Sequence, residues 1–216
     1  MLDVKNPKGG FFYSSTITAT RDRNIDAEAM DGLIKYLKDA NMYAIARLPA
    51  LRNYEYGLNH TSDGLPTSGG YLWADSGYCY WLNPSSQGTL THLIQIVTEL
   101  KDLGFDEVVF EEFRFPDTDK IVFKADKKAA IANAAATLVS TCSTENFTIS
   151  FEGSASFPLP EGRCRLYLEG VSAANAESTA ASFGFEDPAL RLVFLTEVHD
   201  TRFDICSVLR PLEAAH

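Results

Sequence analysis

The sequence predicts an α/β fold, specifically a TIM (β/α)8-like barrel that is short or incomplete, on three observations. Apolar strand patterns alternate with helical patterns along most of the chain, which is typical of βαβ units and a mostly parallel sheet. Each strand pattern is apolar on one side only, which favours a barrel over a flat sheet that is buried on both faces. The chain has 216 residues, whereas a typical TIM barrel has about 250, and only six or seven strands are recognisable.

The predicted strands rest on short apolar runs, and the predicted helices rest on apolar residues spaced at i, i+3, i+4 and i+7. Asp26 is a suitable cap for the first helix, because its side chain can accept hydrogen bonds from the free N–H groups of the first turn. The strands are expected at residues 1–5, 43–47, 107–113, 147–153, 164–170, 190–198 and 205–209, and the helices at residues 26–41, 89–103, 124–142 and 173–183.

The alternation of side chains along each strand separates an apolar face from a polar one. Val108 and Phe110 share one face of the third strand, whereas Glu107, Val109 and Glu111 share the other. The other strands show the same pattern, and most finish on a charge. In TIM barrels the catalytic residues come from these carboxyl ends. The sequence therefore predicts a ring of charges at the mouth of the barrel, formed by Lys5, Arg47, Glu111, Glu152, Glu169 and Glu197. The alternative is a purely structural network of ion pairs, because a fold and its charges do not fix a function.

Composition indicates one globular domain that spans residues 1–216. The formal net charge of −10 argues against a nucleic-acid partner, because binding to the phosphate backbone needs a basic surface. No apolar stretch is long enough for a membrane span, and the N-terminus has no apolar signal core. The sequence thus predicts a soluble chain and leaves its compartment open.

The motifs of metal and cofactor sites are missing from the sequence. The four cysteines are widely spaced without a C-x-x-C pair, so we expect most of them to be small buried side chains rather than parts of a zinc framework or a disulfide scaffold. There is no dinucleotide, P-loop, H-E-x-x-H or G-x-S-x-G motif. We therefore predict no metal and no cofactor.

Four segments carry a resemblance to a known family. The segment GFDEVVFEEFRFP, residues 104–116, resembles the GFDEIQFDYVRFP motif of a family of bacterial glycosyl hydrolase domains related to the alpha-amylase-like TIM barrels. LDVKNPKGGFFYSS, MYAIARLPALRN and WADSGYCYWLNPSS are similar to further segments of that family, in the same order. The resemblance covers about residues 2–116. It implies a TIM barrel with a sugar-directed site, and it implies that a first strand and helix would precede Leu2.

The resemblance also implies roles for two glutamates. In related amylase-like enzymes, the strand of this motif supplies a nucleophilic aspartate and the next strand supplies a glutamate acid/base. By position in the strands these residues are Glu111 and Glu152. The alternation of side chains along the strands points to the same two residues independently of the resemblance. The Asp-Tyr pair of the family is Glu111-Glu112 here, so the carboxylate reaches one methylene further.

Glycoside hydrolysis usually needs two carboxylates, about 5–5.5 Å apart for retention and about 6.5–9.5 Å apart for inversion. Neighbouring strands lie about 4.8 Å apart, so Glu111 and Glu152 can meet the first requirement, and two nearby carboxylates raise the pKa of one of them. We expect the other members of the ring to contact the substrate: Lys5, Arg47, Glu169 and Glu197.

The segment 48–88 is longer than a loop that only connects two secondary-structure elements, and it contains both tryptophans. Trp73, Tyr78 and Trp81 are candidates for a platform under a sugar ring, because aromatic faces offer flat contact area. The alternative is that they form a small core that keeps the segment ordered.

The sequence therefore predicts a glycoside hydrolase that acts on an oligo- or polysaccharide, with Glu111 as nucleophile or base and Glu152 as general acid. The alternative is a catalytically inactive barrel that binds carbohydrate or a protein partner. The exposed edges of an open barrel would also favour pairing with a second copy of the chain, which predicts a homodimer.

Overall fold

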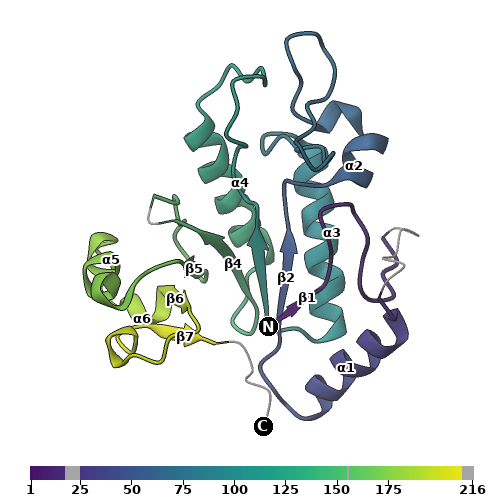
Figure 1. The fold of residues 1–216 in the computed structure, drawn as a ribbon. Helices are drawn as coiled ribbons and strands as arrows, with labels where there is room; N and C mark the ends of the chain where they lie inside the picture. Colours follow the sequence, from purple (N-terminus) through teal and green to yellow (C-terminus); the bar gives the residue numbers. More distant parts are fainter. Residues whose placement is uncertain (18–24, 155, 211–216) are drawn as a thin grey trace.

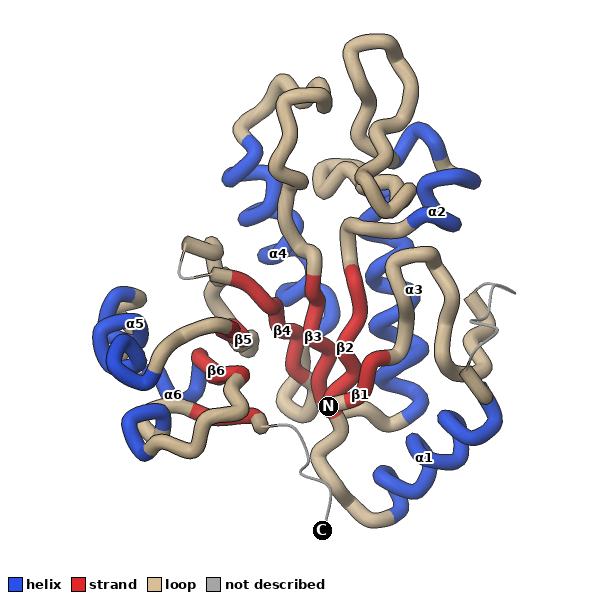
Figure 2. Tube along the Cα trace, in the orientation of Figure 1, coloured by secondary structure: helices blue, strands red, loops and turns tan. Residues whose placement is uncertain are grey.

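The computed structural model describes residues 1–17, 25–154 and 156–210, and its seven strands form one curled, parallel sheet (Figures 1 and 2). The strands cross the sheet in chain order, and β1 and β7 form its two edges. Helices connect most of them, but β4 is joined to β5 by a loop and β6 to β7 by a 3-10 turn. This is the arrangement of a TIM barrel that does not close, and it confirms the predicted fold. The strands are β1 (Leu2–Asp3), β2 (Ile45–Pro49), β3 (Glu107–Glu111), β4 (Thr148–Gly153), β5 (Leu166–Glu169), β6 (Leu192–Leu195) and β7 (Ser207–Leu209).

All the α-helices of the described residues except α5 (Ala176–Ser182) begin at a side chain that caps the first turn. Asp26 accepts hydrogen bonds from the backbone of Glu28 and Ala29, as predicted, and Ser86 and Asp126 cap two further helices. The helices are α1 (Ala27–Asp39), α2 (Tyr54–Asn59), α3 (Gln87–Leu103), α4 (Lys127–Cys142), α5 (Ala176–Ser182) and α6 (Pro188–Arg191), with 3-10 turns at Thr61–Asp63, Ala173–Asn175 and Thr201–Phe203. None of the helices among the described residues is both long and apolar enough to cross a membrane.

The structure differs from the prediction mainly in the segment 48–88, which contains α2. This helix has only six residues, too few to show a helical period, and it includes Gly57, a residue that weakens helices. Its start is fixed by Asn53, whose side chain accepts a hydrogen bond from Tyr56 N. β1 is shorter than predicted, and the predicted helix 173–183 is divided between a 3-10 turn and α5.

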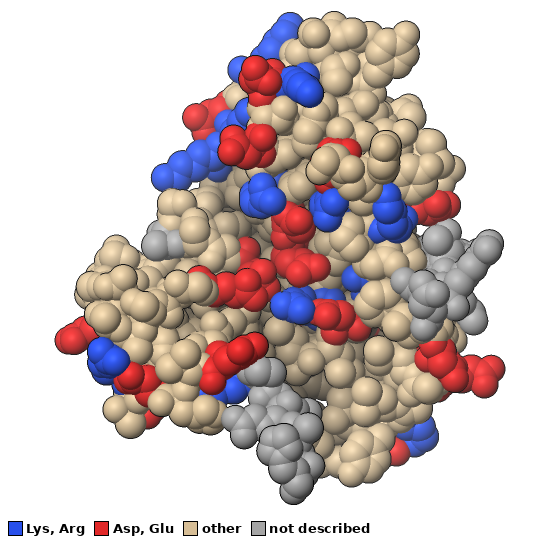
Figure 3. Space-filling model, in the orientation of Figure 1, with Lys and Arg blue, Asp and Glu red and all other residues tan. Residues whose placement is uncertain are grey.

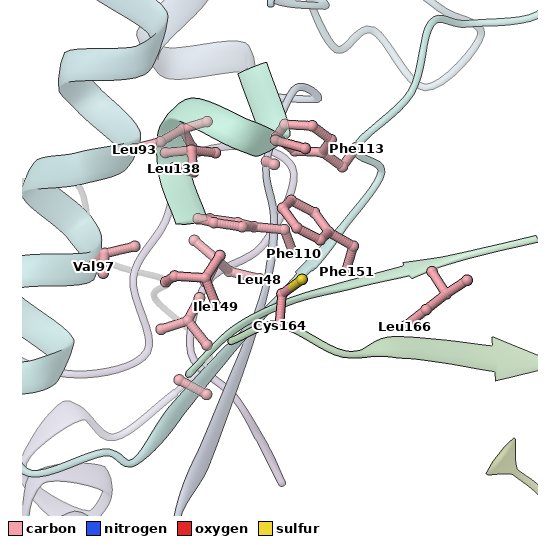
Figure 4. Packing of buried hydrophobic residues seen from close by; sticks show 14 of the residues in the cluster. Leu48, Leu93, Val97, Phe110, Phe113, Leu138, Ile149, Phe151, Cys164 and Leu166 are labelled. Carbon is pink, nitrogen blue, oxygen red and sulfur yellow. The ribbon is translucent and has the colours of Figure 1, made fainter. Parts of the chain in front are cut away.

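The main core lies between the convex face of the sheet and the helices that cover it. α3 and α4 lie side by side behind β2–β4 (Figure 1). Figure 4 shows Phe110 and Phe151 of the sheet beside Phe113, with Leu93 of α3 and Leu138 of α4 close by. All four cysteines are free and buried, which confirms the burial predicted for most of them.

The concave face carries a smaller apolar cluster, formed by Ile45, Val109, Tyr167 and Val193. Val109 therefore faces the inside of the barrel while its neighbours Val108 and Phe110 belong to the outer core. The predicted alternation of the third strand is confirmed. This small cluster forms a floor beneath the charged carboxyl ends of the strands.

Glu107 lies on the same concave face, but at the amino end of β3 and fully buried. Its carboxylate accepts hydrogen bonds from the hydroxyls of Tyr43, at 2.9 Å, Tyr167, at 3.0 Å, and Ser150, at 2.5 Å, and pairs with Arg165 at 2.9 Å. A buried carboxylate with four partners has a structural role, because each of its lone pairs accepts a hydrogen bond and the group is shielded from solvent.

Replacing Glu107 with alanine is expected to destabilise the fold by about 3 kcal/mol or more, because the change leaves Arg165 and two tyrosine hydroxyls without their acceptor. Urea denaturation would measure the loss. The matched control is Glu145→Ala, at an exposed turn position, which should change the free energy of unfolding by less than about 0.5 kcal/mol. Equal stability of the two variants would contradict the assignment.

Candidate active site at the carboxyl ends of the strands

Arg47 of β2 is the centre of a charged cluster on the concave face. Its guanidinium binds Asp3 of β1 with two nitrogens, Nε–Oδ1 at 2.6 Å and Nη2–Oδ2 at 3.2 Å. Arg47 Nη1 lies 3.5 Å from Glu152 Oε2, and Arg47 Nε lies 4.0 Å from Glu111 Oε2. Asp3 and Arg47 are direct neighbours in the sheet register. One arginine therefore holds carboxylates from three strands near one point.

A cleft of about 540 Å³ opens above this cluster. This volume falls within the range of about 300–1,000 Å³ in which small-molecule sites occur. Acidic side chains gather across the middle of the face in Figure 3, with basic side chains beside them. The charged residues that line the cleft are Arg52, Glu111, Glu112, Arg114, Glu152 and Glu169.

The two central glutamates hold their protons more tightly than free glutamates do. Burial raises the pKa of Glu152 to about 7, with further repulsion from Glu169 and Glu111, although Arg47 acts in the opposite direction. Burial also raises the pKa of Glu111 against the attraction of Arg47. A pair of neighbouring carboxyls with unequal pKa values can supply one acid and one carboxylate at neutral pH.

A second layer of ion pairs forms the rim of the cleft. Arg52 Nε binds Asp75 Oδ2 at 2.5 Å, and Arg52 Nη1 lies 3.9 Å from Glu112 Oε1. Glu112 in turn binds Arg114 at 2.8 Å. Burial alone would favour the neutral acid of Asp75, but hydrogen bonds from Arg52, Cys79 N and Trp81 hold its pKa at about 2.

Glu112 has a φ of +51°, a conformation that non-glycine residues rarely adopt. The turn at the end of β3 therefore directs Glu111 to the cluster around Arg47 and Glu112 to the rim. The doubled glutamate of the sequence serves two different sets of ion pairs.

The structure brings together only part of the predicted ring. Arg47, Glu111, Glu152 and Glu169 meet at the cluster and its cleft. Glu197 lines an adjoining cavity of about 630 Å³, which also includes Arg47 and Glu169. Lys5 is buried and lines a separate, smaller cavity instead.

The aromatic candidates do not line this cleft. The Trp73 and Trp81 rings lie 6.4 Å apart, and Trp81 is buried, with its Nε1 donating to Asp75 at 3.1 Å. Arg114 stacks over Trp81 with its Cζ 5.1 Å from the ring centroid. Tyr78 is exposed. Trp81 thus packs against Arg114 and helps to hold Asp75, the partner of Arg52, while Trp73 lies beside Trp81.

Sequence reasoning omitted Asp3, Arg52 and Asp75 from the site. Asp3 could have been found, because it alternates with Leu2 and Val4 on the polar side of its strand. Arg52 and Asp75 lie in the aperiodic segment 48–88, and only the fold brings them together. Within the described part of the chain, no group of three His, Cys, Asp or Glu side chains could hold a metal ion.

Comparison with known proteins relates the fold to carbohydrate-active proteins. A family model described as "Putative glycosyl hydrolase domain" matches residues 1–147. Among curated proteins, none matches this chain.

Three solved structures illustrate the structural similarity. A hypothetical protein from Ruminiclostridium thermocellum is 24% identical, with a TM-score of 0.59 over 69% of this chain and 80% of that one. Aspergillus fumigatus Ega3, solved with galactosamine, is 13% identical, with a TM-score of 0.57 over 83% and 78% of the two chains. The glycoside hydrolase domain of PelA from Pseudomonas aeruginosa is 14% identical, with a TM-score of 0.54 over 81% and 75%. At these identities the likeness concerns the fold.

Proposed function

This chain belongs to the family described as "Putative glycosyl hydrolase domain", and on that premise we propose that it hydrolyses glycosidic bonds of an oligo- or polysaccharide with Glu111 and Glu152. The observation that carries the proposal is the meeting of these two glutamates at one arginine, in one cleft, at the carboxyl ends of adjacent strands. Catalytic residues of TIM barrels occupy this position.

Glu152 is the general acid in this proposal. Its pKa of about 7 leaves much of the carboxyl protonated near neutral pH, and a general acid works best when its pKa lies near the operating pH. The proton passes from Glu152 to the glycosidic oxygen as the bond to the anomeric carbon breaks. Glu169, beside it in the cleft, keeps the proton on Glu152 by repulsion and is placed to accept a hydrogen bond from a sugar hydroxyl.

Glu111 is the nucleophile, or the base that activates water. It is the other carboxyl of the pair, and the nearby Arg47 favours its ionised form. As an anion it can attack the anomeric carbon directly or take a proton from an attacking water. Arg47 is a positioning residue, since it contacts both carboxylates and is itself fixed by Asp3.

A carbohydrate-binding barrel without catalysis is the second candidate. The ion pairs of Arg47 with Asp3, Glu111 and Glu152 favour it, because such a network can also be purely structural. In that case the cleft would bind a sugar and leave it intact.

The test is the release of reducing ends from a panel of α- and β-linked oligosaccharides, compared with the Glu111→Gln/Glu152→Gln double variant. Release by the wild type that disappears in the double variant, while Glu145→Gln retains it, would support the proposal. Binding of an oligosaccharide without release, by protein that melts cooperatively, would support the second candidate. NMR of the first-formed anomer then distinguishes retention from inversion.

A further inference from the structure

A second cavity, of about 210 Å³, lies outside the carboxylate cleft, between the end of β1, α2 and α3. It shares no lining residue with that cleft. Its character is polar and rich in hydrogen-bond donors. The side chains that give it this character are Lys5, Asn53, Asn59, His60, His92 and Gln95.

The unusual member of this set is Lys5, which follows β1 and is only 3% exposed. Its Nζ donates to Asn6 O at 3.3 Å, and among the described residues no carboxylate lies within ion-pairing distance of it. An ammonium has three N–H donors, and burying one without a counter-ion costs several kcal/mol. A protein relieves that cost either by deprotonating the lysine or by admitting an anion.

Apart from the Glu55 carboxylate, the other polar side chains that line the cavity are amides, imidazoles and the Tyr56 phenol, with no second Lys or Arg. Asn53 Oδ1 accepts a hydrogen bond from Tyr56 N, which turns its Nδ2 toward His92 Nε2, at 3.4 Å. That arrangement makes Nε2 the acceptor and leaves the proton of the neutral ring on Nδ1. The Tyr56 ring is stacked between the His60 and His92 rings, with centroids 4.1 and 4.0 Å away. Both imidazoles are thereby held in place.

We propose that this cavity is a binding site for a small carboxylate anion, which pairs with the Lys5 ammonium. The single ammonium, set among amide and imidazole side chains, matches a single negative charge. A dianion such as phosphate would face one cation together with the carboxylate of Glu55, which also lines the cavity. None of the side chains that line this cavity has a role in the glycosidase proposal, although Glu111 acts on Lys5 from a distance.

The proposal predicts a pH dependence. Burial lowers the pKa of Lys5 to about 7, against the attraction of Cys79 and Glu111, while burial and Lys5 together lower the pKa of His92 to about 3. Acetate remains ionised throughout this range, so Lys5 controls its affinity. The affinity for acetate should therefore fall about tenfold between pH 6 and pH 8, as Lys5 loses its proton. The titratable groups that surround Lys5 are Glu55, His60, Cys79, His92 and Glu111.

The experiment compares acetate with acetamide, its neutral isostere, at constant ionic strength. Thermal unfolding of the whole chain is followed for the wild type, for Lys5→Met and for the exposed control Lys120→Met. We expect acetate, and not acetamide, to raise the Tm of the wild type and of Lys120→Met, and to leave that of Lys5→Met unchanged. Equal effects of acetate and acetamide on the wild type would overturn the proposal.

A second measurement does not depend on the folding of Lys5→Met. In wild-type protein labelled with ¹³C-lysine, the Cε resonance of Lys5 reports its protonation. Acetate should raise the apparent pKa of this lysine, because it stabilises the charged form, whereas acetamide should leave it unchanged. The same titration curve in both solutions would show that Lys5 is a buried neutral amine without an anion site.

Discussion

Glu152→Gln is expected to lower kcat by about 10²–10⁴-fold on oligosaccharides, because general acid catalysis contributes that much to breaking a bond with a poor leaving group. Glutamine keeps the shape of the side chain but has no proton to give. Aryl glycosides with acidic leaving groups need little protonation, so their turnover should fall much less. A uniform loss on both substrate types would contradict the role of Glu152 as acid.

The stability of the same variant separates lost chemistry from misfolding. The pKa of Glu152 in the folded chain, about 7, is above the 4.5 of an ordinary glutamate. A group with a raised pKa contributes stability that is fully present below pH 4.5 and is lost as the pH rises through about 7. Glutamine stays neutral, so Glu152→Gln should be at least as stable as the wild type at pH 8, measured by Tm. A variant that melts well below the wild type there would contradict the assigned burial and repulsion.

The strand pattern alone predicted the fold and the two central glutamates. Alternation on β3 and β4 set Val109, Glu111 and Glu152 apart from Phe110 and Phe151, because only a one-sided strand can face a polar barrel mouth. Glu107 has the same phase as Glu111, yet it lies at the opposite end of the strand. The alternation of side chains predicts which face of the strand a residue lies on. Only its position along the strand distinguishes the buried structural Glu107 from Glu111 of the site.

The structure of the segment 48–88 could not be predicted from the sequence, for a physical reason. Between β2 and α3 its elements are isolated bridges, one 3-10 turn and one short helix, which have no period to recognise. Composition showed that the segment is ordered, but not which side chains reach the cleft. Trp81 packs against Arg114 and donates a hydrogen bond to Asp75. It was a candidate for a sugar-binding platform, and in the structure it supports the ion pairs at the rim of the cleft. The alternation of side chains placed Lys5 in the predicted ring of charges. In the structure Lys5 follows the end of β1 and lines a different cavity.

Glu111→Gln is the second large effect, and we expect kcat to fall about 10³-fold or more, because no neighbouring carboxylate can replace a nucleophile or base at that position. Glu169 belongs to β5, two strands away from β3. Unlike Glu152→Gln, this variant should lose activity toward aryl glycosides as fully as toward oligosaccharides, since leaving-group acidity does not help a missing nucleophile. Glu145→Gln serves again as the exposed control.

Glu111→Gln should also change Glu152. Repulsion from Glu111 is one of the causes that raise the pKa of Glu152, so its removal should lower that pKa toward the ordinary value of glutamate, which ¹³C NMR of the labelled carboxyl would measure. Arg47, no longer shared with a second glutamate, should act in the same direction. The shift is expected whether or not the barrel is catalytic, because it depends only on the distance between charges. A lowered pKa together with lost turnover would identify a coupled catalytic pair. A lowered pKa in a protein that turns over no substrate would identify a binding site. An unchanged pKa would mean that the two carboxyls do not act on each other at all.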